Sequence, residues 1–392
     1  MKSKHVCAAA MWIVLGCVRS IGYAQSPEET SAPTSDSAQN PDPAQSPQPA
    51  PAAPPAKPEK RGEIAAAPIP VVDPTIGNGI ALTAVYTVHL QKDDKVSPPS
   101  DFAAGGFRTS DGSWGFAAGT KLYLMRDRFR VLFGTGTGTV KYKFYGIGNE
   151  SLDGTGIPIV QSGKGILAGL LVRAYHRWYV GSRYYYFKVT TGLDNTNSQS
   201  TPPIREVTLK LPVAALGPHI QRDTRDSQYY ARSGSVYDTK FYFSTRSVGA
   251  LFTYQNYEMA FQQYFALGKR QVLAYRVSAC EVNGHAPFFA LCMLGNSADM
   301  RGYPLGRYLD RRMLVGQVEY RREIWWRFGA AAFMGAGQVA PTFTDFTASN
   351  TRPGGGVGLR FTVAPKNHIN IKADYGLGQG SHAWYVGIGE AF

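Results

Sequence analysis

Residue types that carry enzyme chemistry occur along the chain, but their spacing fits none of the common catalytic motifs. The sequence has no nucleophile elbow, HExxH zinc motif, P-loop or paired CxxC motif. The glycine-rich run 134–138 lacks the lysine and helix that a phosphate cradle needs, and His285 and His382 have no ligand spacing. The acids Asp223 and Asp226 could do acid–base work or bind calcium, but the arginines around them favour an ion-pair network. The sequence therefore predicts a protein without enzyme activity, cofactor or metal.

The cysteines offer one covalent link. Of the four, Cys7 and Cys17 fall in an expected signal sequence and leave with it, so Cys280 and Cys292 remain. In an oxidising compartment, this even pair could form one disulfide beside a long loop. The alternative of two free thiols stays open, because the sequence does not give the Cα separation that a disulfide needs.

The first part of the chain has the features of export. Residues 1–24 combine a basic start, a short apolar stretch and small residues before a cleavage site after Ala24, which predicts a signal peptide. A lipoprotein signal ending at Cys17 is the alternative. Residues 25–63 are rich in Pro, Ala, Ser and Gln, which predicts a disordered periplasmic segment. After the signal there is no run of 18 apolar residues, so the sequence predicts no transmembrane helix.

From about residue 64 onward, short segments alternate between polar and apolar residues, which predicts strands with two unlike faces. A soluble sandwich alternates as well, but here aromatic residues, 12% of the chain, load the apolar face. That combination indicates lipid outside and a wet lumen inside. The clearest polar faces, each opposite an apolar one, are Gln317, Glu319, Arg321 and Glu323; Asn370, Lys372 and Asp374; and Asp238, Lys240 and Tyr242.

We predict an all-β fold in which residues 64–392 form one antiparallel transmembrane barrel of about sixteen strands. An even number places both termini in the periplasm, and the last strand is expected to end at Phe392. The longest gap, 284–310, then opens on the extracellular side. The segments are 64–73, 78–91, 101–109, 113–125, 129–145, 160–174, 177–193, 205–222, 234–245, 250–267, 271–283, 311–323, 326–340, 352–363, 368–379 and 382–392.

The charge balance is strongly basic. The net charge is +13, and +10 remains once the signal, with its three basic residues, is removed. One interpretation is a basic surface that contacts lipid phosphates. The other is a cationic lumen that favours anionic or unfolded-chain cargo. Nucleic acid does not fit a secreted chain.

The long gap contains a motif that resembles a known family. Arg301-Gly302-Tyr303, followed by Val318-Glu319-Tyr320-Arg321, is similar to the BamA/TamA-type outer-membrane assembly superfamily, also called the bacterial surface antigen barrel. In that family the tripeptide sits in the sixth extracellular loop, which folds back into the barrel, and its Arg bonds to acids on the lumen wall. The resemblance covers roughly 64–392 and includes the segments 145–150, 223–226, 232–234, 354–360 and 386–392, with Phe392 as the insertion signal.

Two departures from the family pattern qualify what the resemblance implies. Gly335 stands where the family has the acid that partners the loop Arg. A buried guanidinium still needs a carboxylate, so we expect Arg301 to bind lumen acids on nearby strands, Glu319 first and Asp374 second. The family's periplasmic POTRA domains do not fit in 25–63, which implies a member without them.

The resemblance implies a protein of the Gram-negative outer membrane that aids insertion or translocation of proteins, or of lipids, through a seam between the first and last strands. Gly387 and Gly389 would weaken the last ladder and suit a labile seam. The expected partners are outer-membrane lipid and lipopolysaccharide, the machinery that inserts the barrel itself, and an unidentified periplasmic partner or protein cargo. A passive pore or structural barrel is the alternative, and a surface adhesin is a third.

Overall fold

The computed structural model describes residues 62–392 except 74–75, 92, 95, 150–155, 195–208, 296–297, 305 and 366. The expected signal peptide and nearly all of the expected periplasmic segment lie outside the described residues. No helix among the described residues is long and apolar enough to cross a membrane.

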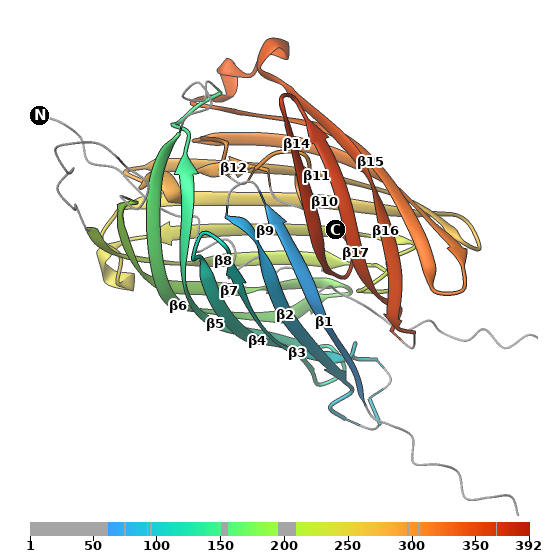
Figure 1. The fold of residues 1–392 in the computed structure, drawn as a ribbon. Coiled ribbons are helices and arrows are strands. Elements are labelled where there is room, and N and C mark those ends of the chain that lie inside the picture. Colours follow the sequence, from blue (N-terminus) through green and yellow to red (C-terminus); the bar gives the residue numbers. More distant parts are fainter. Residues whose placement is uncertain are drawn as a thin grey trace, which may run out of the picture.

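The described residues form one sheet of sixteen antiparallel strands, each paired with its neighbour in the chain, which confirms the all-β prediction (Figure 1). A separate two-stranded sheet, β12 with β13, lies inside the long loop. The strands are β1 (Gly62–Asp73), β2 (Gly77–Val88), β3 (Ser100–Thr109), β4 (Trp114–Leu124), β5 (Phe129–Phe144), β6 (Ile157–Tyr175), β7 (Trp178–Leu193), β8 (Leu209–Asp223), β9 (Gly234–Ser244), β10 (Tyr254–Gly268), β11 (Gln271–Gly284), β12 (Cys292–Leu294), β13 (Tyr308–Asp310), β14 (Arg312–Trp325), β15 (Phe328–Ala340), β16 (Arg352–Ala364), β17 (Ile369–Gly378) and β18 (Ser381–Ile388).

The two faces of the wall follow the predicted alternation. On β14, Leu314 and Val318 are more than two-fifths exposed, whereas Glu319 and Arg321 are fully buried in the lumen. Because successive side chains of a strand point to opposite faces, this pattern repeats around the barrel. Large apolar side chains therefore cover the outside, as expected of a wall that faces lipid.

Connections alternate between the two ends of the barrel. We call the end where β1 begins and β18 ends the terminal rim; it carries the connections 89–99, 125–128, 176–177, 224–233, 269–270, 326–327 and 365–368. The opposite end, which carries the long connection 285–311, is the loop rim. This parity places the start of β1 and the end of β18 on one side, as an even strand number predicts.

The first and last strands meet at a seam that differs from every other strand boundary. β1 and β18 lie side by side (Figure 1), yet within the described residues no register of backbone hydrogen bonds joins them. Among the described residues, apolar packing and a polar contact near the ends of the two strands join the two sides instead. The carboxylate of Glu63 on β1 accepts hydrogen bonds from the backbone and side-chain nitrogens of Asn367, at 3.2 and 2.9 Å.

The last strand ends at Ile388, so the prediction that it runs to Phe392 was wrong. Gly389 adopts a φ of +87°, which turns the chain out of the wall. The buried Glu390 then binds Arg360 at 2.7 Å and Asn370 at 2.7 Å. Because a buried carboxylate needs such partners, the tail is held inside the lumen.

Candidate functional site

The connection 285–311 folds into the barrel from the loop rim. It is not a structureless loop, because it contains the 3-10 turn η2 (Phe288–Ala290) and the β12–β13 pair. Its apolar side chains form a large part of the buried core of that half of the lumen. The loop therefore behaves as a folded insert that fills the barrel interior.

A disulfide ties this insert to the wall. Cys280 on β11 is bonded to Cys292 on β12, with a Cα separation of 5.7 Å. The sequence had left the state of these two cysteines open. The bond fixes the first half of the insert against β11, so the second half, which carries the Arg301 motif, starts from an anchored point.

Arg301 is completely buried and reaches the lumen wall. Its guanidinium contacts Asp374 on β17 at 2.6 Å, forms an ion pair with Glu319 on β14, and donates to Gln317 at 3.1 Å. The ring of Phe333 lies below it, 3.4 Å from the guanidinium carbon to the ring centroid. The structure thus brings together the loop arginine and both acids that were expected to hold it.

These contacts belong to a larger network of three arginines and three acids. Glu319 also binds Arg321 at 2.6 Å, and Asp374 also binds Arg360. Arg360 continues to Glu390 of the C-terminal tail at 2.7 Å. Burial removes water from all six groups, so each depends on its neighbours for charge compensation. The network connects the loop, strands β14, β16 and β17, and the tail.

Sequence reasoning missed Arg360 and Glu390 as members of this network. Arg360 ended the segment 354–360 of the family resemblance, and Glu390 was placed in the last strand. Their pairing depends on the register between β16 and β17 and on the inward turn of the tail. No sequence motif indicates either the register of these two strands or the inward turn of the tail.

Gly302 and Tyr303 dock the loop onto the last strands. Gly302 has a φ of +112°, and a Cβ built on it would lie 2.5 Å from the carbonyl oxygen of Leu377. The Tyr303 hydroxyl donates to the carbonyl of Pro353 at 2.5 Å, and Ser381 donates to the carbonyl of Gly302 at 2.7 Å. The tripeptide therefore braces β16, β17 and the start of β18, the strands on one side of the seam.

Gly335 lies on the lumen face of β15, where the family pattern has an acid. A Cβ at this position would lie 2.5 Å from the carbonyl oxygen of Gly316. A larger side chain would thus require the wall to shift. The contacts to Arg301 come instead from β14 and β17, with Phe333 on β15 as a flat support.

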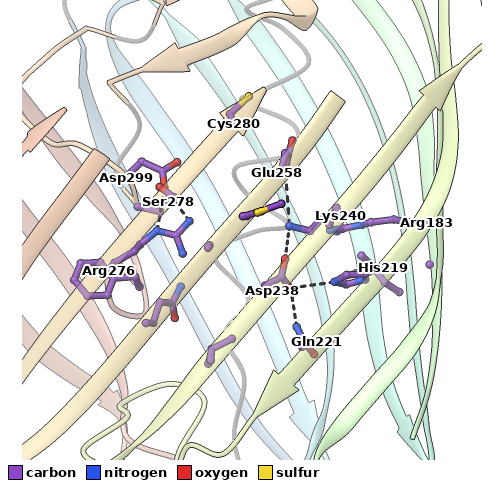
Figure 2. A pocket seen from close by; sticks show the side chains of 18 of the residues that line it. Arg183, His219, Gln221, Asp238, Lys240, Glu258, Arg276, Ser278, Cys280 and Asp299 are labelled. Atoms are coloured by element: carbon purple, nitrogen blue, oxygen red, sulfur yellow. Dashed lines mark hydrogen bonds and ion pairs between the residues drawn. The ribbon is translucent and has the colours of Figure 1, made fainter. Parts of the chain in front are cut away.

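Between the loop and the terminal rim the lumen contains a cavity of about 280 Å³. Figure 2 shows Asp238 there, shared by His219, Gln221 and Lys240 at 3.0, 2.9 and 2.5 Å. Charges of both signs line the cavity. No group of three or more His, Cys, Asp or Glu in the described part of the chain is placed to hold a metal ion.

The residues first considered for enzyme chemistry have structural positions. The run 134–138 lies in the middle of β5, paired with β4 and β6. His285 is in a turn, where its backbone nitrogen donates to the carbonyl of Thr253 at 3.0 Å. Asp223 pairs with Arg225 at 2.9 Å, in line with the ion-pair interpretation of that turn.

The fold and this site define a class: a sixteen-stranded barrel with a lipid-type exterior, an arginine-bearing loop bound inside the lumen, and a seam without a ladder. Comparison with known proteins agrees. The family model described as the Omp85 superfamily domain matches residues 133–392, and the chain belongs to that superfamily. None of the curated protein sequences is similar enough to count as a match.

Similar solved structures support the same fold. BamA from Haemophilus ducreyi lacking POTRA domains 1-3 aligns with a TM-score of 0.54 and 12% identity, over 84% of this chain and 69% of that one. CdiB from Acinetobacter baumannii gives 0.53 and 10%, and CdiB from Escherichia coli gives 0.57 and 14%, each over 84% of this chain. The chain spans 59% and 62% of those two chains. At these identities the likeness concerns the fold.

Proposed function

We propose that this chain is a bacterial outer-membrane barrel that aids the insertion or translocation of other proteins through its seam. The observation that carries the proposal is the boundary between β1 and β18, the only strand boundary of the sheet without a hydrogen-bonded register among the described residues. Every other boundary would have to break a hydrogen-bonded ladder in order to open. Membership of the Omp85 superfamily and the similarity to BamA and CdiB support the same direction.

The chemistry of the seam suits a polypeptide client. An unladdered strand edge presents backbone N–H and C=O groups that can pair with an incoming strand. In lipid those groups cannot be left without partners, so a client strand that pairs with β1 or β18 gains hydrogen bonds that water no longer supplies. The seam therefore offers an entry point for a strand that leaves the lumen.

The Arg301 network holds the strands on one side of the seam in place. It connects the loop to β14 and β17, while Gly302 and Tyr303 brace β16 to β18. Strands on the C-terminal side of the seam are thus held together as one unit. A passive pore is the less supported function, because the folded loop occupies the loop-rim half of the lumen.

The test is a reversible lock across the seam. Glu63→Cys combined with Asn367→Cys places two thiols on either side of a contact whose side-chain ends lie 2.9 Å apart. Because cysteine is shorter than the two side chains that it replaces, a bismaleimide with a reducible spacer joins the thiols. We expect the cross-linked lock to abolish insertion of an unfolded outer-membrane barrel into vesicles that hold the purified chain, and cleavage of the spacer by a reductant to restore it. Retained insertion with the lock closed would overturn the proposal.

The matched control is a lock within a permanent ladder. Thr139 and Ser162 face each other on β5 and β6, with their hydroxyls 2.8 Å apart. Thr139→Cys with Ser162→Cys should take the same cross-link without any effect on insertion. If neither chain variant nor the parent accelerates insertion, and the parent instead gives a steady conductance in planar bilayers, the passive pore replaces the proposal.

A further inference from the structure

The connection between β8 and β9 does not stay at the terminal rim. Residues 224–233, which we call the strap, enter the lumen mouth from that end. Several of its side chains are buried there, although they belong to a turn between two strands. They are Arg225, Gln228, Tyr229, Tyr230 and Ala231.

The strap is shaped by its own polar residues. Asp223 accepts hydrogen bonds from the Arg225 guanidinium at 3.1 and 2.9 Å. Asp226 accepts the backbone N–H of Arg232 at 2.9 Å, and the Ser227 hydroxyl accepts that of Tyr230 at 3.2 Å. Such local bonds fix the turn before it meets the wall. The strap is therefore a preformed element and not a slack connection.

One part of the strap is bound to the first strands of the barrel. The Tyr229 hydroxyl donates to the carboxylate of Asp101 on β3 and lies 3.2 Å from the hydroxyl of Thr87 on β2. The hydroxyl of Tyr123 on β4 donates to the side chain of Gln228 at 2.8 Å. Burial raises the pKa of Tyr229, so the phenol keeps its proton and remains the donor to Asp101.

The next residues of the strap are bound to the last strands. The ring of Tyr230 stacks on His368, between β16 and β17, with centroids 4.1 Å apart and planes at 5°. Ala231 packs in a small buried cluster with Tyr264 and the ring of the C-terminal Phe392. Neighbouring residues of one turn thus contact strands on opposite sides of the seam.

The seam lies between these two sets of contacts. Tyr229 belongs to a buried apolar cluster that contains Ala65 of β1 together with Ile369 of β17 and Ile388 of β18. This cluster spans the seam, and the strap supplies one of its side chains, Tyr229. Among the described residues no ladder joins β1 to β18, and these contacts together with the Glu63–Asn367 bond join the two sides at the terminal rim.

We propose that the strap is an internal tie across the seam, and that the Tyr229–Asp101 bond must release before the seam opens. The tie acts from inside the lumen, so a chain segment that enters from the terminal rim meets the strap first. This inference rests on the proposed function, because it assigns a regulation to the same seam. It is physically separable from that function, since seam opening can be measured without any client.

Thiol accessibility measures the opening. Ala65→Cys places a probe at a seam position that is 2% exposed, and its labelling by a maleimide reports each opening. Tyr229→Phe keeps the ring and removes only the hydroxyl that Asp101 accepts. A hydrogen bond to a charged group usually contributes enough that its loss should raise labelling roughly tenfold or more. Tyr230→Ala, which removes the stack on His368, should raise labelling as well.

Two controls isolate the seam. Tyr185→Phe removes another buried phenol, which pairs with Tyr254 at 3.1 Å in the loop-rim half, and should leave labelling of Ala65→Cys unchanged. Ala214→Cys, fully buried on the laddered strand β8, should stay unlabelled in Tyr229→Phe. Resistance of each folded variant to unfolding in detergent without heating shows that it still forms the barrel.

The outcomes separate the two proposals. Unchanged labelling of Ala65→Cys in both Tyr229→Phe and Tyr230→Ala, in folded barrels, would overturn the tie. If the seam lock blocks insertion but these variants label like the parent, the tie is wrong and the proposed function stands. If labelling rises as expected while the seam lock leaves insertion intact, the tie stands and the proposed function is wrong.

Discussion

Replacing Arg301 by alanine is the change that most directly perturbs the hold of the loop on the lumen wall. The side chain is fully buried between Glu319 and Asp374 and stacked on Phe333. Breaking a buried ion pair by removing one partner usually costs about 3–5 kcal/mol. Here both acids keep a second arginine, Arg321 for Glu319 and Arg360 for Asp374, so we expect the lower end, about 3 kcal/mol.

Limited proteolysis of the loop can measure this loss. When a site is cut only after local opening, the rate follows the population of the open state. A loss of about 3 kcal/mol corresponds to roughly a hundredfold faster cleavage within 298–311. The cleavage rate of Arg301→Lys should lie between those of the parent and of Arg301→Ala, because an ammonium cannot bind both carboxylates as a guanidinium does.

The matched control is Arg311→Gln in the same connection. Arg311 is exposed, and its guanidinium donates only to the carbonyl of Gly284 among the bonds that the structure records, at 2.9 Å. We expect its cleavage rate to stay within about threefold of the parent rate, as for most surface changes. Equal cleavage of Arg301→Ala and Arg311→Gln would refute the argument that the buried network holds the loop.

Three further predictions concern other parts of the same site. Cys292→Ser removes the disulfide and should lower the heat-unfolding midpoint, because about 2 kcal/mol of stabilisation is lost. An unchanged midpoint would show that packing alone holds the insert. Gly302→Ala should speed loop cleavage about tenfold or more, since its Cβ would meet the Leu377 carbonyl at a φ of +112°; parent-like cleavage would contradict this. Burial lowers the pKa of His368 below its ordinary 6.5, so the neutral ring contributes stability that is complete above pH 6.5 and is lost as the pH falls through the lower folded value. Heat unfolding measured at a series of pH values tests this: as the pH is lowered below about 6.5, the unfolding temperature should decrease in the parent but not in His368→Phe. The charged groups near this imidazole are Glu323, Glu390 and Arg232.

Much of the barrel could be predicted because lipid and lumen impose period two on each strand. On β14 the polar face of Glu319 and Arg321 was recognised from alternation alone, and the strand bounds differ by at most two residues. The start of β10 was placed four residues too early, since the residues before Tyr254 form a turn around Gly249 with a φ of +95°. Ends of strands depend on such local conformations more than on the pattern.

The site was predictable only in part. Arg301 came from the family resemblance, and its two acids came from the lumen faces of their strands. The tail was missed, because the turn at Gly389 and the pairing of Glu390 with Arg360 join parts distant in sequence. The turn after Asp223 was correctly interpreted as an ion-paired element, but its reach across the seam depends on long-range contacts that leave no local signal.

The central claim is that a client chain meets this barrel at the seam, and site-specific photocrosslinking measures that contact directly. Ile64 on β1 and Met334 on β15 are equally suited as outward positions, 68% and 70% exposed. With a photoreactive residue in each place, in turn, and an unfolded outer-membrane barrel as client, we predict crosslinks from position 64 and none above background from position 334. Equal crosslinking from both positions, or none from position 64 during active insertion, would contradict the account.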